Sequence, residues 1–287
     1  MIIIPEKPIY VRNFYCVTPS GGEADHLRLA SEPDYKQVIS DYNLRRRMGK
    51  LLKMAVYSGL SALTDISSDD VAGIITATGI GFMKDTVKFA DAMYDGDETL
   101  LNPSPFMQST FNTASGYIAL IRKIHAYNTT YVQRSFGLLS AFADAIMLIC
   151  ENPNKSVLVG GFDEAVSEVD ALRRRLGLYQ CKSGAFLPLG EGAGFFCLTD
   201  KAGTCRESKN TIIFRGMASA GESCSDMIHD YNDYDVVRCS DFVDVYGAFP
   251  MLLSVVAAHC LCQHPQSSLL CVDDVNPDGC MIFFEIR

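Results

Sequence analysis

Residues 189–198 read LGEGAGFFCL and hold the densest glycine cluster of the chain, directly before an apolar, strand-like run. A phosphate-binding interpretation fails on its details, because a dinucleotide-binding loop needs a third glycine that opens a helix and a P-loop needs Gly-Lys-Ser/Thr. Glycines that lead into a strand usually mark a bend or a close approach of two backbone segments. Taken alone, the cluster favours a structural role.

On both sides of this cluster, apolar strand-like segments alternate with helix-like segments. The predicted strands are 10–17, 71–76, 156–159, 195–198, 211–214, 268–272 and 281–286, and the predicted helices are 48–63, 112–124, 138–150 and 251–262. Continuous apolar strands that alternate with helices indicate an α/β fold with buried sheets. No Pro-, Gly- or Ser-rich stretch is long enough to be a domain linker, so we expect a single domain over 1–287 with a seam at the polar stretch 200–210.

The composition is that of an ordinary globular protein, with 287 residues, 48% hydrophobic and 21% charged, and a net charge of −9. A nucleic-acid-binding protein usually carries a basic face. The basic clusters at 45–47 and 173–175 are short and lie in helix-like stretches, which is typical of a solvated or ion-paired helix face. We therefore expect no nucleic-acid partner.

The eleven cysteines include no Cys-x-x-Cys pair, and the closest two are Cys260 and Cys262. Zinc sites usually show ligand pairs at short loop spacing, whereas a free cysteine in an apolar run normally acts as a small core hydrophobe. We expect a reduced, cytoplasmic chain with no metal and no cofactor. The longest apolar run, 251–262, is shorter than the roughly 20 residues of a membrane span.

A second motif, STFNTASG at 109–116, places small residues at the predicted start of a helix. Such a helix start can present a nucleophile, because the helix dipole stabilises an anion there. Asn112 or Thr113 can equally be an N-cap, and the chemistry of the residues alone favours the cap.

Taken in order, the motifs resemble those of the β-ketoacyl synthases. The matching segments are the first strand (10–18), RRMGK (46–50), ATGIG (77–81), the strand and turn after the active-site helix (VGGFDEA, 159–165) and the cluster Gly190, Glu191, Gly192, Ala193 and Gly194. Segments 103–120 and 127–131 are similar to synthase-like proteins of bacterial aryl polyene and dialkylresorcinol (flexirubin-type) clusters. The resemblance covers most of 10–200 and implies a thiolase-like layered α/β fold. It implies that helix 112–124 lies buried between sheets, packed closely through Ala114, Ser115 and Gly116, and that 201–287 is a shortened second half that lacks elements between about 215 and 245.

The catalytic positions that the resemblance implies are degenerate. The family places cysteine in Thr-Ala-Cys-x-Ser-Gly at the start of the buried helix, and the alignment puts Thr113 there. The Ala-His-Gly-Thr motif is absent, and Asp244 stands at the second histidine position. His229 and His259 remain as lone histidines. We expect no catalytic residue at these positions, and a motif or pocket lined by Phe111, Asn112 and Ser115.

The resemblance implies a non-catalytic subunit of the chain-length-factor type, which supports a partner synthase in fatty acid- or polyketide-type biosynthesis of an aryl polyene lipid or pigment. Its partners would be an active synthase or a second copy of itself, with an acyl carrier protein as a further candidate. Synthases of this fold dimerise through edge strands, and segment 105–111, with Phe106 and Met107, is where we expect that strand. Two alternatives stay open: an acyl-transfer enzyme with a non-standard nucleophile, and a self-associating acyl-binding or scaffold protein.

Overall fold

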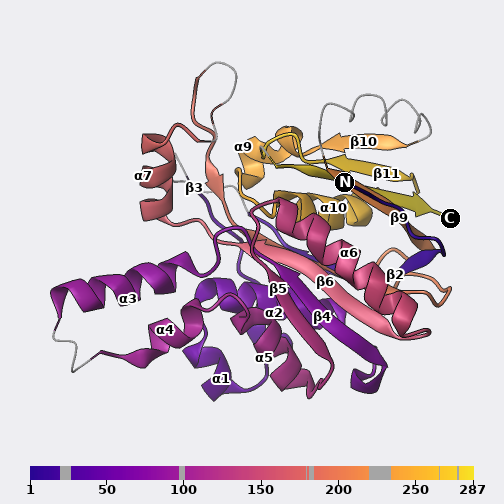
Figure 1. Cartoon of the computed structure of the whole chain (residues 1–287), viewed down its shortest axis with the longest axis horizontal. Coiled ribbons are helices and arrows are strands. Elements are labelled where there is room, and N and C mark those ends of the chain that lie inside the picture. The colour runs from indigo at the N-terminus through magenta and orange to yellow at the C-terminus, as the bar shows by residue number, and fades with distance from the viewer. Residues whose placement is uncertain are drawn as a thin grey trace.

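The computed structural model describes residues 1–19, 27–96, 101–178, 180, 184–219, 234–264, 266–276 and 278–287. A mixed sheet dominates the fold, with strands in the order β10-β11-β12-β9-β2-β8-β6-β4-β5 and with β1 paired to β9 (Figure 1). The strands are β1 (Ile2–Ile3), β2 (Ile9–Val17), β3 (Leu27–Arg28), β4 (Val71–Ala77), β5 (Tyr127–Tyr131), β6 (Ser156–Asp163), β7 (Leu189–Gly190), β8 (Gly192–Thr199), β9 (Ile212–Ser219), β10 (Asp235–Arg238), β11 (Leu269–Val272) and β12 (Cys280–Ile286). The α-helices are α1 (Tyr42–Arg47), α2 (Lys50–Ala62), α3 (Met83–Asp95), α4 (Pro103–Ser109), α5 (Thr113–Arg122), α6 (Phe136–Glu151), α7 (Ser167–Arg175), α9 (Val243–Tyr246) and α10 (Leu252–Gln263). Short 3₁₀ turns are η1 (Tyr35–Gln37), η2 (Ser68–Asp70) and η4 (Cys239–Phe242).

The two halves of the chain repeat one topology. In the first half β4 and β6 are parallel, and β8 and β2 follow antiparallel. In the second half β10 and β11 are parallel, and β12 and β9 follow antiparallel. One helix directly precedes the second parallel strand of each half, α6 before β6 and α10 before β11. This repeat is the layered α/β architecture that the sequence predicts.

Side-chain alternation along β8 separates the two faces of the first half. Phe195 and Cys197 join the core cluster of α2 and α5, whereas Phe196 and Leu198 join the cluster of α6 and α10. The strands of the second half cover the same two helices, so that Phe284 of β12 stacks on Phe196 with ring centroids 5.7 Å apart. The helices α6 and α10 therefore lie in the central layer.

Helix α10 is buried along almost its whole length, as a helix that is apolar on all sides should be. Neither α10 nor any other helix in the described ranges has the length and hydropathy needed to cross a bilayer.

The prediction that helix 112–124 is buried between sheets is wrong. Helix α5 buries only one stripe, where Ile118 packs against Gly59 of α2, and Leu120 on its other side is exposed. A Cβ at Gly116 would meet nothing within 4 Å, so this glycine does not serve close packing. The buried position belongs to α6, which directly precedes the strand that the motif at 159–165 identifies.

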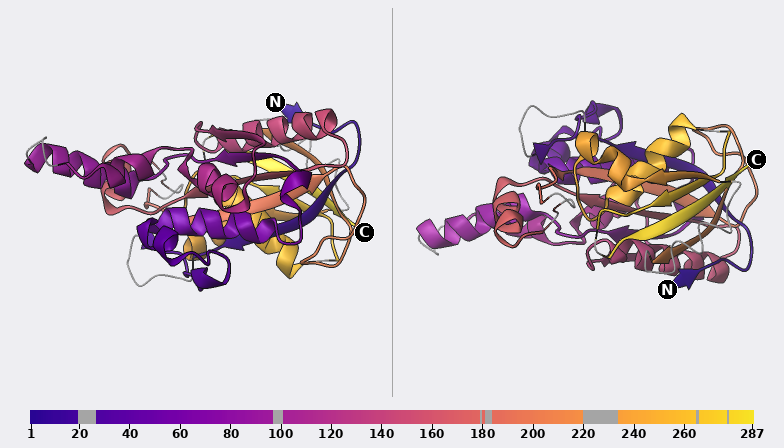
Figure 2. Two further views of the ribbon diagram at one scale, coloured as in Figure 1. Left: turned by 90° about the horizontal axis from the view of Figure 1, so that it is seen from below. Right: turned by 90° about the horizontal axis from the view of Figure 1, so that it is seen from above.

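The second half is the shorter one, as predicted. Of segment 215–245, where we expected the missing elements, residues 220–233 lie outside the described residues, and the shortening that the structure describes falls at 239–251. Residues 78–135 of the first half hold α3, α4, α5 and β5, whereas the corresponding residues 239–251 hold only η4 and α9. Helices α3 and α4 project from the body as an arm (Figures 1 and 2), and Phe89 meets Phe106 across it with ring centroids 5.2 Å apart.

The prediction of an edge strand at 105–111 is also wrong, because α4 spans Pro103–Ser109. Asn102 caps this helix by accepting a hydrogen bond from the Ser104 backbone N–H at 3.0 Å, and a proline in the first turn suits a helix start. The edge strand beside α4 and α5 is β5.

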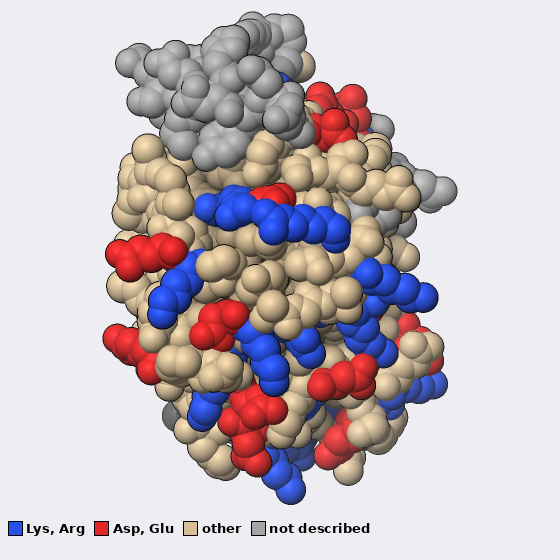
Figure 3. Space-filling model, turned by 90° about the vertical axis from the view of Figure 1, so that its right-hand side faces the viewer, with Lys and Arg blue, Asp and Glu red and all other residues tan. Residues whose placement is uncertain are grey.

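The face that carries the two termini mixes both signs of charge. Lysine and arginine side chains lie among aspartates and glutamates across it (Figure 3), and Glu285 pairs with both Arg215 and Arg287. Among the described residues of this face, no large area carries one sign of charge alone.

Candidate functional site

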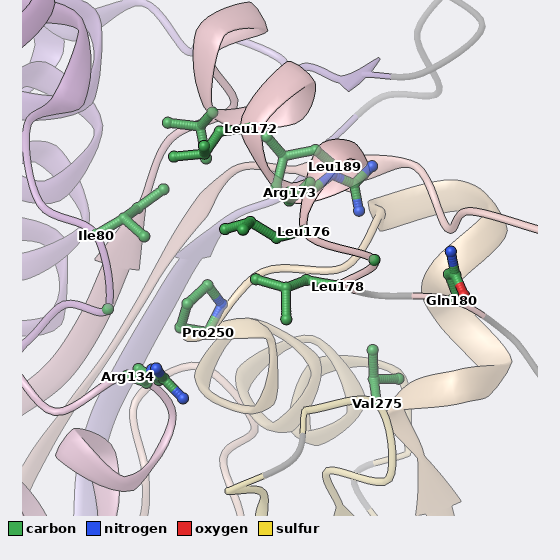
Figure 4. Close-up of a pocket in the computed structure, with 13 residues that line it drawn as sticks. Ile80, Arg134, Leu172, Arg173, Leu176, Leu178, Gln180, Leu189, Pro250 and Val275 are labelled. Atoms are coloured by element: carbon green, nitrogen blue, oxygen red, sulfur yellow. The ribbon is translucent and has the colours of Figure 1, made fainter.

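A cavity of about 430 Å³ lies where the start of α6 meets the turn after β4, the segment before α10 and helix α7. Aliphatic side chains form most of its wall, among them Leu172, Leu176, Leu178 and Pro250, and their tips point toward one common space (Figure 4). Arg134, which directly precedes Ser135, places its side chain at the rim of the cavity. None of these lining residues was predicted from the sequence.

Asp163, at the end of β6, links the turn after β4 and the segment before α10, which both line this cavity. One carboxylate oxygen accepts hydrogen bonds from the Thr78 hydroxyl at 2.8 Å and from the backbone N–H groups of Gly79 and Ile80, each at 3.0 Å. The other oxygen accepts from the Met251 N–H at 3.1 Å, just before α10. The side chain is fully buried, and this burial raises the pKa of Asp163 to about 6 against the opposing effect of its four donors.

The glycines of the same motifs let these segments approach closely. A Cβ at Gly79 would lie 2.2 Å from Cβ of Pro250, and one at Gly161 would lie 2.6 Å from the sulfur of Met251. Only glycine leaves room for such contacts. The motifs at 77–81 and 159–165 therefore fix the start of α10 against β4 and β6.

The resemblance implies a nucleophile at the start of the buried helix, and the buried helix that precedes β6 is α6, not α5, to which the alignment assigned it. The residues there are Arg134, Ser135 and Phe136. Arg134 has a left-handed backbone with φ of 49°, which is uncommon for a residue with a side chain. Ser135 is buried. Among the described residues that line the cavity, none is a cysteine or a histidine.

The predicted nucleophile position, Thr113, lies elsewhere, at the start of α5 in the outer layer. Its hydroxyl is 2.7 Å from the Thr110 hydroxyl and donates to the Met107 carbonyl at 3.3 Å, so its partners include no base. Ser115 donates its hydroxyl to the Asn112 carbonyl at 3.0 Å, and the Asn112 side chain makes no capping hydrogen bond. These contacts are those of an ordinary helix start.

Phe111 and Asn112 line an open groove of about 570 Å³ beside β5, and not the cavity at α6. The Phe111 ring packs on Gly81, where a Cβ would lie 2.3 Å from it. The structure therefore places these two residues at the sheet edge.

Asp244, the predicted degenerate histidine position, is exposed on α9, and its backbone carbonyl accepts a hydrogen bond from Arg28 at 2.7 Å. His259 packs edge-on against the rings of Phe242 and Tyr246, and burial lowers its pKa. Neither residue lines the cavity. His229 lies outside the described residues.

Glu191 of the glycine-rich cluster is buried, and its hydrogen bonds and ion pair join separate segments of the fold. It accepts hydrogen bonds from the N–H groups of Ala30 at 2.7 Å and Ala165 at 3.3 Å, and it forms an ion pair with Lys50. A second cavity, of about 480 Å³, adjoins Glu191 and the buried Glu164, and desolvation raises the pKa of Glu164 to about 7.

The neighbours of Glu191 in the cluster also face the backbone of the second half. A Cβ at Gly190 would lie 1.9 Å from the Tyr246 carbonyl, and one at Gly194 would lie 2.3 Å from the Ser254 carbonyl. Ala193 is fully buried, and Gly192 lies against the Val17 carbonyl. The small residues of the cluster thus allow the segment around α9 and α10 to pack closely against the first half.

Comparison with known proteins agrees with this architecture. The ishigamide ketosynthase/chain length factor superposes with a TM-score of 0.74 at 14% identity, over 98% of this chain and 99% of that chain. A type II polyketide synthase acyl carrier protein in complex with its ketosynthase gives 0.69 at 15% identity, over 98% and 100%. A ketosynthase in complex with its chain length factor from Xenorhabdus doucetiae gives 0.57 at 13% identity, over 98% and 100%.

At these identities the structural likeness shows a shared fold, which is the thiolase-like fold of the ketosynthases. No curated protein sequence matches the chain. Residues 29–177 match the family described as β-ketoacyl synthase, N-terminal domain. Because this match spans more than half of the sequence and the architecture agrees with it, the chain belongs to the β-ketoacyl synthase family.

Proposed function

We propose that this chain is a non-catalytic synthase-like subunit of the chain-length-factor type. It would support a partner synthase in fatty acid- or polyketide-type assembly of an aryl polyene lipid or pigment. The observation that supports the proposal is the start of the buried helix α6, which holds Arg134 and Ser135 where the resemblance implies a cysteine. A thiolate accepts an acyl chain near neutral pH, whereas a serine hydroxyl needs an adjacent base. Among the described residues that line the cavity, no histidine supplies one.

The same reasoning disfavours the acyl-transfer alternative at Thr113. Its hydroxyl is engaged with a second hydroxyl and a backbone carbonyl, neither of which is a base strong enough to activate it.

An exposed apolar surface supports the partner-subunit proposal. Phe106 and Met107 are 56% and 66% exposed on α4, and Phe111 and Val132, 44% and 39% exposed, line the groove beside the edge strand β5. An edge strand with exposed apolar neighbours is a typical docking surface. We propose that a synthase subunit covers it, and two of the solved relatives are described as pairs of a ketosynthase and a chain length factor. The acyl carrier protein in the third suggests a further partner.

Co-expression with a cysteine-containing synthase of the same gene cluster tests the proposal. We expect a one-to-one complex by size-exclusion chromatography with light scattering. Met107→Asp should weaken it by at least tenfold, because a charge would be buried in the interface. Val245→Asp is the matched control: Val245 is 50% exposed on α9, and its substitution should leave the complex intact.

The other outcomes separate the alternatives. A homodimer that Met107→Asp disrupts, together with no synthase capture, would favour the self-associating acyl-binding protein. Covalent labelling by an acyl thioester, lost in Thr113→Ala, would favour the acyl-transfer enzyme.

A further inference from the structure

We propose that the cavity at the start of α6 binds a free carboxylic acid with an apolar chain, with the carboxylate on Arg134 and the chain against helix α7. The inference rests on the proposed function in one respect: the cavity is free for such a ligand because no condensation takes place there.

The wall of the cavity is apolar, and its leucines are largely exposed. Leu172, Leu176 and Leu178 are 56%, 61% and 47% exposed, and all three line this one cavity. Ile80 and Pro250 face them from the other side (Figure 4). Aliphatic side chains that converge on a space of about 430 Å³ are typical of a site for a small apolar ligand. The apolar chain of the proposed ligand would pack against this surface.

The positive charge at the rim of the cavity would bind the carboxylate head group of the ligand. Two arginines line the cavity, and they differ in the hydrogen bonds and ion pairs that they make within the fold. Arg173 is buried and bonds to the Asp170 carboxylate at 2.6 Å and to the Leu187 carbonyl, so its charge is neutralised within the fold. Arg134 is 78% exposed, and its ion pair within the described part of the chain is a long one, to the exposed Asp278 at 3.7 Å.

An exposed pair of this length contributes little, and a ligand carboxylate can replace Asp278. The planar guanidinium suits a carboxylate because it can donate two parallel hydrogen bonds. Arg134 also stands two residues before α6 begins, so the positive end of that helix adds to the attraction. A neutral thioester or alcohol would gain neither effect, and the site should therefore select acids.

Isothermal titration calorimetry of the full chain with octanoate and with 1-octanol tests this selectivity. We expect octanoate to bind at least tenfold more tightly than the alcohol. Arg134→Gln should remove that difference, and Asp278→Asn should strengthen octanoate binding several-fold, because it removes the competing carboxylate. Arg175→Gln on α7 makes the same charge change outside the cavity lining and should have no effect. Leu176→Ser should weaken both ligands.

Equal affinity for acid and alcohol, or an octanoate affinity that Arg134→Gln leaves unchanged, would overturn the proposal, as would the absence of octanoate binding. The outcome of this experiment is independent of the partner-subunit proposal. Arg134→Gln should leave the synthase complex intact, so a chain that captures its synthase but binds no octanoate would refute only the ligand.

Discussion

Replacement of Asp163 by alanine should destabilise the fold substantially, although this residue performs no proposed chemistry. The substitution removes the fully buried carboxylate that accepts hydrogen bonds from the backbone N–H groups of Met251, which is buried, and of Gly79 and Ile80, which are half-buried. Each such group costs about 1–3 kcal/mol, or about 6 kcal/mol for three. Removal of a buried charge offsets part of this loss. The pKa of Asp163 is raised from 3.8 to about 6, which corresponds to about 3 kcal/mol at pH 7. The expected net loss at pH 7 is therefore about 3 kcal/mol.

Urea unfolding followed by circular dichroism measures this loss. Asp144→Ala is the matched control, because Asp144 accepts two hydrogen bonds from Tyr127 and Tyr131 at 3.0 and 3.1 Å in a partly exposed place. Water replaces those partners, and the control should cost less than about 1 kcal/mol. A loss below about 1 kcal/mol for Asp163→Ala would refute the role of this carboxylate as the link between β4, β6 and α10.

The penalty should also depend on pH with a defined sign. Because the folded-state pKa of Asp163, about 6, lies above the unfolded value of 3.8, the native state binds more protons between these values. The stability contributed by this group is present below pH 4 and is lost as the pH rises through 6. Wild type should gain roughly 1.4 kcal/mol from this group between pH 7 and pH 5, and Asp163→Ala should lack that gain. A wild-type-minus-variant difference that is constant across this range would contradict the raised pKa.

Three further outcomes follow. Wild type itself should be more stable at pH 5 than at pH 7 in urea unfolding, because burial also raises the pKa of Glu164 to about 7 and that of Asp273 to about 6; greater stability at pH 7 would contradict this. Neither Thr113→Cys nor Ser135→Cys should give condensation of carrier-protein thioesters, since no histidine lines the described part of the cavity; turnover by either variant would refute the non-catalytic assignment. Gly190→Ala should destabilise by at least about 1–3 kcal/mol through its clash with the Tyr246 carbonyl, whereas Gly116→Ala on α5, with open space around it, should stabilise by about 0.5–1 kcal/mol; equal effects of the two in thermal unfolding would contradict the packing.

The layered α/β architecture could be predicted because its central strands and helices are apolar throughout. The apolar runs at 156–159 and 195–198 fall in β6 and β8, and the run at 251–262 falls in α10. The edge strand β5 was missed because its sequence, YNTTY, is polar and half exposed, so it lacks the apolar signal of a buried strand. Segment 105–111 was misassigned because helix 112–124 was taken for the buried helix and the resemblance places the edge strand beside that helix, whereas α4, with a proline in its first turn, covers most of the segment.

The candidate site was harder to predict, because its location depends on which helix is buried. The local match Ala114-Ser115-Gly116 placed the nucleophile position at the start of α5, whereas the motif at 159–165 identifies the helix just before it, which is α6. The second signal is the stronger one, because chain connectivity fixes α6 beside β6. The apolar wall on α7 had no such signal, since Leu172, Leu176 and Leu178 form a cavity only when the turn after β4 and Pro250 are brought opposite them.

The packing around Asp163 explains how synthase motifs can persist in a chain for which we propose no catalysis. The turn at 77–81 and the segment at 159–165 meet the start of α10 through four hydrogen-bond donors on one carboxylate and through glycines that allow contact with Pro250 and Met251. A change in any of these residues would first cost stability, whether or not a thiolate stood at the start of α6. The residue that would carry the acyl chain has no such constraint, because Arg134 lies at the exposed rim. Loss of the nucleophile is therefore compatible with a fully retained framework, and resemblance in the framework motifs alone is no argument for condensing activity.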